Sequence, residues 1–180
     1  MVRCTAINLV TEQAVQNKHS ILIIGIGNPY RGDDGVGHRI AQDIKEKSPD
    51  HVNVIEQSGD GISLMESWKD ADTVILIDAV HSGKNFGTIY RFEAHEQAIP
   101  SRFFHYSTHA FGVAEAIELA RTLKQLPKNL IVYGIEGKCF EAGIGLSLEV
   151  EKSAQEVVKR VQQDIHNCSP RKCTKYHEIK

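Results

Sequence analysis

Short apolar runs rich in β-branched residues recur along this chain, and stretches of helical spacing separate them. The runs at 21–24, 73–77 and 130–133 have the length and branching of buried strands. Between the first two, apolar residues recur every three or four positions from Val36 to Ile44, the spacing of a helix with one buried face. This alternation predicts a three-layer α/β domain with a mostly parallel sheet, in which ligand sites lie beyond the carboxyl ends of the strands.

The other expected elements complete this pattern. Less continuous strands are expected at 52–55 and 88–92, and helices around 64–68, at 113–123 and after Ser147. The last helix is expected to pack against the sheet through an apolar stripe formed by Val150, Ala154, Val157, Val158, Val161 and Ile165.

The length of 180 residues fits one domain with a single hydrophobic core. We expect residues 1–19 to form a loose N-terminal extension, 20–167 the single α/β domain and 168–180 a polar C-terminal tail. The cysteines at 4, 139, 168 and 173 are scattered, so free thiols are expected rather than a disulfide framework or a zinc site.

The composition narrows the range of partners. A formal net charge of -2 gives no electrostatic reason to bind nucleic acid or anionic lipid. No window approaches the roughly 20 apolar residues that a membrane span needs, and the first residues do not read as a signal peptide. We therefore expect a cytoplasmic protein, a monomer, that acts on a small molecule or on another protein.

The loop GIGNPYRGDDGVG, residues 25–37, is the densest concentration of glycine in the chain. A dinucleotide-binding turn would need its third glycine at the position of Tyr30, and the acidic pair Asp33-Asp34 would lie where a pyrophosphate should bind. No nucleotide cofactor is therefore expected. One aspartate of the pair can cap the following helix, which leaves the other free to point into a site for a cation.

Two further candidates lie on other loops. Asp78 directly follows the run 73–77, at the end of what should be a central strand, where it could accept loop amides or act as a metal ligand or general base. His109 lies just before the helix at 113–123, and His81 and His105 are competing candidates nearby. Two carboxylates and one imidazole form a ligand set suited to nickel, zinc or another borderline divalent ion.

Four ordered motifs between about residues 21 and 165 resemble those of the hydrogenase maturation endopeptidases. They are the glycine-asparagine loop with its acidic pair, the VILIDAV strand, the S-x-H before a helix, and the late VYGIEG followed by GxxLS. The resemblance implies a three-layer α/β/α sandwich of the phosphorylase/hydrolase-like kind. It also implies an endopeptidase that removes the C-terminal extension of a nickel-iron hydrogenase large-subunit precursor after nickel has been inserted.

The resemblance also assigns roles to residues. It makes Asp34, Asp78 and His109 the metal ligands, which recognise nickel already held by the substrate rather than a cofactor of the enzyme. Asp34 or Asp78 would then be the catalytic carboxylate, in an aspartyl-protease-like role, and Asp33 would cap the helix. Gly27 and Asn28 would be the substrate-binding residues and would shape the loop, with Asn28 either binding the substrate or bracing the turn.

Two other functions remain open from the sequence. A non-catalytic nickel-binding accessory protein of hydrogenase assembly would use the same three ligands without cleaving anything. A nucleotide-dependent enzyme would use the glycine loop instead.

Overall fold

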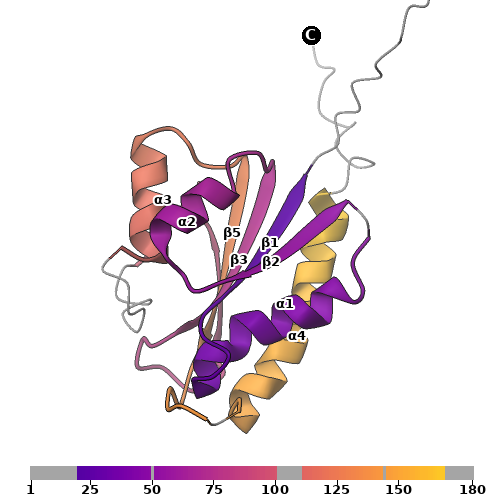
Figure 1. Ribbon diagram of the computed structural model, residues 1–180, viewed down its shortest axis with the longest axis vertical. Helices are drawn as coiled ribbons and strands as arrows, with labels where there is room; N and C mark the ends of the chain where they lie inside the picture. Colours follow the sequence, from indigo (N-terminus) through magenta and orange to yellow (C-terminus); the bar gives the residue numbers. More distant parts are fainter. Residues whose placement is uncertain (1–19, 50, 101–110, 144, 169–180) are drawn as a thin grey trace, which may run out of the picture.

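The computed structural model describes residues 20–49, 51–100, 111–143 and 145–168 (Figure 1). The expected N-terminal extension, nearly all of the expected tail and His109 lie outside these residues. No helix in the described ranges is both long enough and apolar enough to cross a membrane.

A five-stranded sheet forms the centre of the domain, with the strand order β2-β1-β3-β5-β4. Strands β1, β2, β3 and β5 are parallel, whereas β4 pairs antiparallel with β5 at one edge. The mostly parallel sheet predicted from the sequence is therefore confirmed. In chain order the strands are β1 (Ile21–Ile26), β2 (Val52–Gln57), β3 (Thr73–Val80), β4 (Ile89–Glu93) and β5 (Asn129–Glu136).

Helices cover both faces of this sheet, as the three-layer prediction requires (Figure 1). The helices α2 and α3 lie on one face, and α1 and α4 lie on the other. A short 3-10 helix, η1, leads directly into α1. The bounds are η1 (Gly32–Gly35), α1 (Val36–Lys45), α2 (Gly61–Ser67), α3 (Val113–Thr122) and α4 (Leu148–Cys168).

The central strands contribute apolar side chains to two hydrophobic cores, one on each face of the sheet, because successive side chains of a strand point to opposite faces. In β1, Leu22 and Ile24 pack towards α2 and α3, while Ile21 and Ile23 pack towards α1 and α4. Every residue of β1 and β3 is buried, which explains their continuous apolar runs. The expected stripe of α4 is also buried, from Val150 to Ile165.

Two boundaries differ from the sequence predictions. Strand β3 continues to Val80, so Asp78 lies inside the strand rather than directly after it. The pairing with β5 continues through Asp78, which stands opposite Gly134, and this pairing keeps the backbone extended. Helix α4 ends at Cys168, the first residue of the expected tail.

Candidate functional site

At the carboxyl edge of the sheet, the start of α1 lies very close to the backbone of β1 and β3. A Cβ atom at Gly37 would lie 2.2 Å from the carbonyl oxygen of Ile26 and 2.4 Å from that of Ile77. A Cβ atom at Gly25 would lie 2.3 Å from the carbonyl oxygen of Gly37. Only glycine allows this approach, and it brings the start of α1, with η1 and its acidic pair, to the ends of β1 and β3.

Gly27 and Asn28 shape the loop that carries Asp34. Gly27 has a φ of 125°, and a Cβ atom there would lie 1.9 Å from the carbonyl oxygen of Asp34. The Asn28 N–H donates to Asp34 Oδ2 at 3.1 Å, and Asn28 Oδ1 accepts from the Tyr30 N–H at 3.0 Å. Asn28 therefore braces the turn, and its other expected role, in binding the substrate, stays a prediction.

Asp34 is half-buried, and burial is the largest influence on its carboxylate. Desolvation raises the pKa of Asp34, while the Arg31 charge, the hydrogen bond from Asn28 and the His38 charge act in the opposite direction. His38 lies on α1, with Nδ1 3.0 Å from Glu56 Oε2 and Nε2 3.2 Å from the carbonyl oxygen of Gln57. The carboxylate is thus accessible from solvent and has basic groups near it.

Asp78 lies deeper, with a residue exposure of 7 %. Its place in the alternation of β3, between Leu76 and Val80, puts its side chain on the face covered by α2 and α3. Burial and the nearby charge of Asp34 raise the pKa of Asp78 to about 8, against a smaller opposing effect of the Ala79 amide. Two carboxylates in such an arrangement share a proton or bind a cation, because their charges repel when both are ionised.

Asp33 has a different role from the helix cap expected for it. Neither η1 nor α1 has a side-chain cap hydrogen bond, and the buried carboxylate of Asp33 instead binds the loop between β5 and α4. It accepts hydrogen bonds from the N–H groups of Lys138, Cys139 and Ser147 and from the Ser147 hydroxyl, at 2.6 to 3.0 Å. The Asp33 N–H donates in return to the carbonyl oxygen of Cys139 at 2.7 Å. The cap prediction is wrong, and Asp33 clamps two loops of the site together.

Glu136 is a second buried clamp, and the sequence reasoning did not single it out. Its carboxylate accepts from the N–H groups of Ser82 and Gly83 and from the Ser82 hydroxyl, at 2.6 to 2.9 Å. It therefore fixes the start of the loop between β3 and β4. The signal in the sequence was its place as the one charged residue of VYGIEG, at the end of a buried strand.

These contacts divide Asp33, Asp34, Asp78 and Glu136 into two pairs. Asp33 and Glu136 accept several hydrogen bonds from loop amides, so their role is to hold backbone in place. For Asp34 and Asp78, desolvation outweighs the contacts that stabilise the charged form. The second pair is therefore the one suited to bind a cation or transfer a proton.

The third expected ligand, His109, lies outside the described residues, as does its competitor His105. Among the residues that the structure does describe, no three histidine, cysteine or acidic side chains are grouped to hold a metal ion. His81 therefore does not complete a ligand set with Asp34 and Asp78. Its ring instead lies edge-on to Phe140, with centroids 6.2 Å apart.

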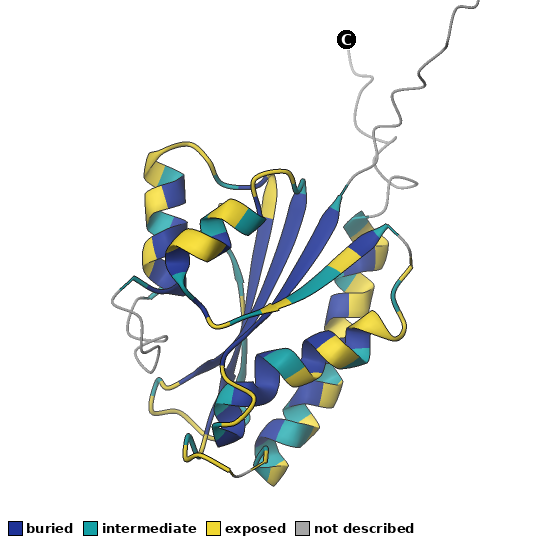
Figure 2. Ribbon diagram, viewed as in Figure 1, coloured by how far each residue is buried: buried dark blue, intermediate teal, exposed yellow. Residues whose placement is uncertain are grey.

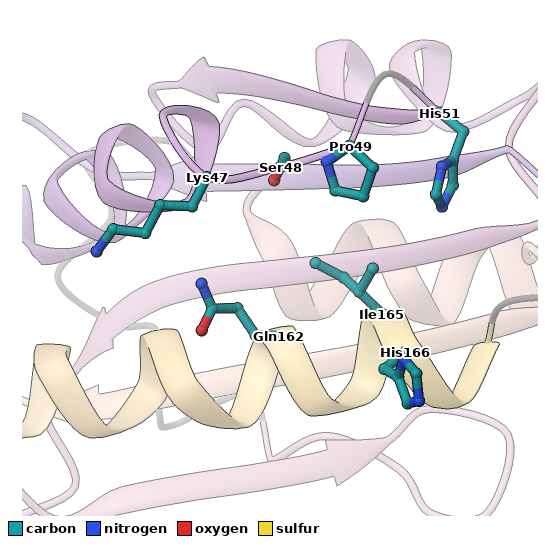
Figure 3. Close-up of a pocket in the computed structure, with 7 residues that line it drawn as sticks. All are labelled: Lys47, Ser48, Pro49, His51, Gln162, Ile165 and His166. Carbon is teal, nitrogen blue, oxygen red and sulfur yellow. The ribbon is translucent and has the colours of Figure 1, made fainter.

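A cavity of about 300 Å³ lies well away from these carboxylates, between the segment that joins α1 to β2 and the end of α4 (Figure 3). It contains none of the residues expected in the site. Its lining consists of Lys47, Ser48, Pro49, His51, Gln162, Ile165 and His166.

Comparison with known proteins identifies the family of this chain. A family model described as hydrogenase maturation protease matches residues 36–164. The hydrogenase 2 maturation protease of Escherichia coli is 29% identical over 145 residues, which span 78% of this chain and 87% of that protein.

Solved structures of similar fold include endopeptidases and hydrogenase maturation proteases. The solution structure of an endopeptidase from Escherichia coli has a TM-score of 0.72 and 28% identity, over 82% of this chain and 93% of that one. The NiFe hydrogenase maturation protease HycI from Thermococcus kodakarensis shares the fold, with a TM-score of 0.64 and 21% identity over 83% and 94% of the two chains. This chain belongs to the hydrogenase maturation protease family, and it is a hydrolase.

Proposed function

We propose that this protein removes the C-terminal extension from the large-subunit precursor of a nickel-iron hydrogenase once nickel has been inserted. Family membership supports an endopeptidase of hydrogenase maturation, and a structural relative is named as acting in NiFe hydrogenase maturation. The observation that carries the proposal is the pair formed by Asp34 and Asp78. Burial and mutual repulsion make it costly to ionise both carboxylates, and a divalent cation bound between them offsets this cost.

The nickel in this proposal belongs to the substrate. Carboxylate oxygens from Asp34 and Asp78 and the imidazole of His109 form the ligand set, and borderline ions such as nickel accept this mixture of oxygen and nitrogen. An ion already bound by the precursor keeps only some of its coordination positions open. The enzyme therefore needs a few well-placed ligands rather than a complete metal site.

The carboxylates also supply the acid–base chemistry of peptide hydrolysis. A water molecule attacks the scissile carbonyl carbon and gives up a proton, and the same proton is later delivered to the leaving amine nitrogen. Asp34 is the better placed acceptor because it is the more exposed of the two. Without a cation, Asp78 has a pKa of about 8 and holds a proton near neutral pH, and a nickel ion bound to its carboxylate would favour release of that proton. The polarised carbonyl next to nickel favours the attack.

The test is direct cleavage. The purified full chain is incubated with a nickel-loaded large-subunit precursor, and the mass of the large subunit is followed over time. The expected result is loss of the C-terminal extension. Persistent full-length precursor that nevertheless binds this protein would contradict proteolysis and favour a nickel-binding accessory role instead.

A further inference from the structure

Besides Ile62 at the start of α2, three large apolar side chains are exposed at the edge of the sheet that holds the carboxylate pair. They are Tyr30 at 79 % exposure, Phe86 at 49 % and Leu148 at 67 %. We call them the apolar rim. They come from the loops that follow β1 and β3 and from the start of α4, which follows β5. Exposed apolar side chains gathered at one edge of a domain mark an interaction surface.

The segments that carry the apolar rim touch one another. The Gly143 N–H donates to the carbonyl oxygen of Tyr30 at 3.0 Å, which joins the first loop to the segment before α4. The Lys138 ammonium lies 5.7 Å from the centre of the Phe86 ring and 3.0 Å from Glu149 Oε1, beside Leu148. The rim is therefore carried by one connected set of loops, and these loops are coloured mainly as exposed in Figure 2.

Two buried carboxylates hold the loops that carry the apolar rim. The clamp at Asp33 ties the Tyr30 loop to the segment before α4, and the clamp at Glu136 fixes the start of the loop that carries Phe86. Asn28 links the rim to the site itself, since it donates to Asp34 and accepts from the Tyr30 N–H. Because buried carboxylates hold the backbone of these loops, less conformational entropy is lost when the rim binds another surface.

We propose that the apolar rim is the docking surface for the large-subunit precursor, where it binds apolar side chains of that protein close to its nickel. This inference rests on the proposed function. A protease must bring the surface around its reacting groups against its protein substrate, and the rim is continuous with the Asp34 loop. Exposed aromatic and aliphatic anchors are the side chains that contribute most when such a surface is covered.

The test uses single-turnover cleavage of nickel-loaded precursor by an excess of the full chain. Tyr30→Ala, Phe86→Ala and Leu148→Ala are compared with wild type. Each is expected to raise the enzyme concentration at half-maximal rate by about tenfold, while the rate at saturation stays within about twofold. The matched control is Leu123→Ala, which removes a leucine of 51 % exposure just after α3, before the start of β5 and so away from the carboxyl edge of the sheet. It should behave as wild type.

The outcomes separate this inference from the proposed function. Rim variants that cleave with the wild-type concentration dependence would overturn the docking surface while leaving the protease function intact. If wild type does not cleave the precursor at all, equilibrium binding of the two proteins is measured by calorimetry with the same variants. Unchanged affinity in the rim variants would overturn the docking surface there too, and affinity lost in them but kept in Leu123→Ala would support it.

Discussion

Asp34 lies near enough to Asp78 for its charge to add to burial in raising the pKa of Asp78 to about 8. The two residues come from separate elements, η1 and β3, that the glycine contact at Gly37 brings together. The folded protein thus holds a carboxylate pair whose fully ionised form is unfavourable in the absence of a cation. This pair makes the site sensitive to protons, and in the proposed function it responds to the divalent ion that the substrate carries.

The first prediction concerns the pH dependence of stability. The pKa of Asp78 is raised in the folded state from an ordinary value of 3.8 to about 8, so the folded protein retains a proton that the unfolded chain releases. The contribution of Asp78 to stability is complete below about pH 4 and is lost as the pH rises towards 8.

Asp78→Asn should remove this loss, because the amide does not ionise. We expect the variant to exceed wild type in free energy of unfolding by a few kcal/mol at about pH 8, and to approach it at about pH 4. Urea denaturation at several pH values measures this difference. Asp43→Asn, at a partly exposed position on α1, serves as the control. A difference from wild type that does not change with pH would contradict the assigned pKa.

The second prediction concerns the Asp33 clamp. Asp33→Ala would leave the N–H groups of Lys138, Cys139 and Ser147 without their acceptor. Because unsatisfied buried donors are costly, we expect a loss of about 3 kcal/mol or more in the free energy of unfolding. Asp43→Ala, which breaks only a partly exposed ion pair with Arg39, should cost less than about 1 kcal/mol. Similar losses in the two variants would show that Asp33 is not a clamp.

The third prediction concerns the approach of α1 to the sheet. Gly37→Ala places a Cβ atom 2.2 Å from the Ile26 carbonyl oxygen, so α1 and η1 must move outward. We expect a loss of about 2 kcal/mol or more in stability and weaker binding of Ni²⁺ to the Asp34 site. Gly145→Ala is the control, since its Cβ atom would have no neighbour within 4 Å. Thermal unfolding measures the stability, and calorimetric titration with Ni²⁺ measures the binding. If Gly37→Ala matched wild type in both, the close approach of α1 to the sheet would not be required for the site.

The sequence predicts much of this fold because the relevant signals are local. The runs at 21–24 and 73–77 identified the central strands, and the stripe from Val150 to Ile165 identified the face of α4 that packs on the sheet. Asp34 and Asp78 could be proposed as a pair because both follow apolar runs of the sequence, and parallel strands bring their carboxyl ends to one edge.

The clamps could not be predicted in this way. Asp33 binds Cys139, which is 106 positions away in the sequence, and Glu136 binds Ser82, which is 54 positions away. Contacts of that separation depend on how the loops pack, and an acidic pair before a helix has a local explanation as a cap that competes with them. The end of β3 was predicted too early for a similar reason, because its pairing with β5 continues beyond the apolar run to Val80.

The most direct test of the central claim is the dependence of cleavage on nickel and on the carboxylate pair. Nickel-loaded and nickel-free precursors are each incubated with wild type, Asp34→Asn, Asp78→Asn and His109→Ala, with Asp43→Asn as the control, and the initial rate of extension loss is measured by mass. We predict that wild type and the control cleave only the loaded precursor and that the three site variants are slower by about 100-fold or more. Two results would contradict nickel-dependent cleavage by the carboxylate pair: equal cleavage of nickel-free precursor by wild type, or a wild-type rate in Asp34→Asn or Asp78→Asn.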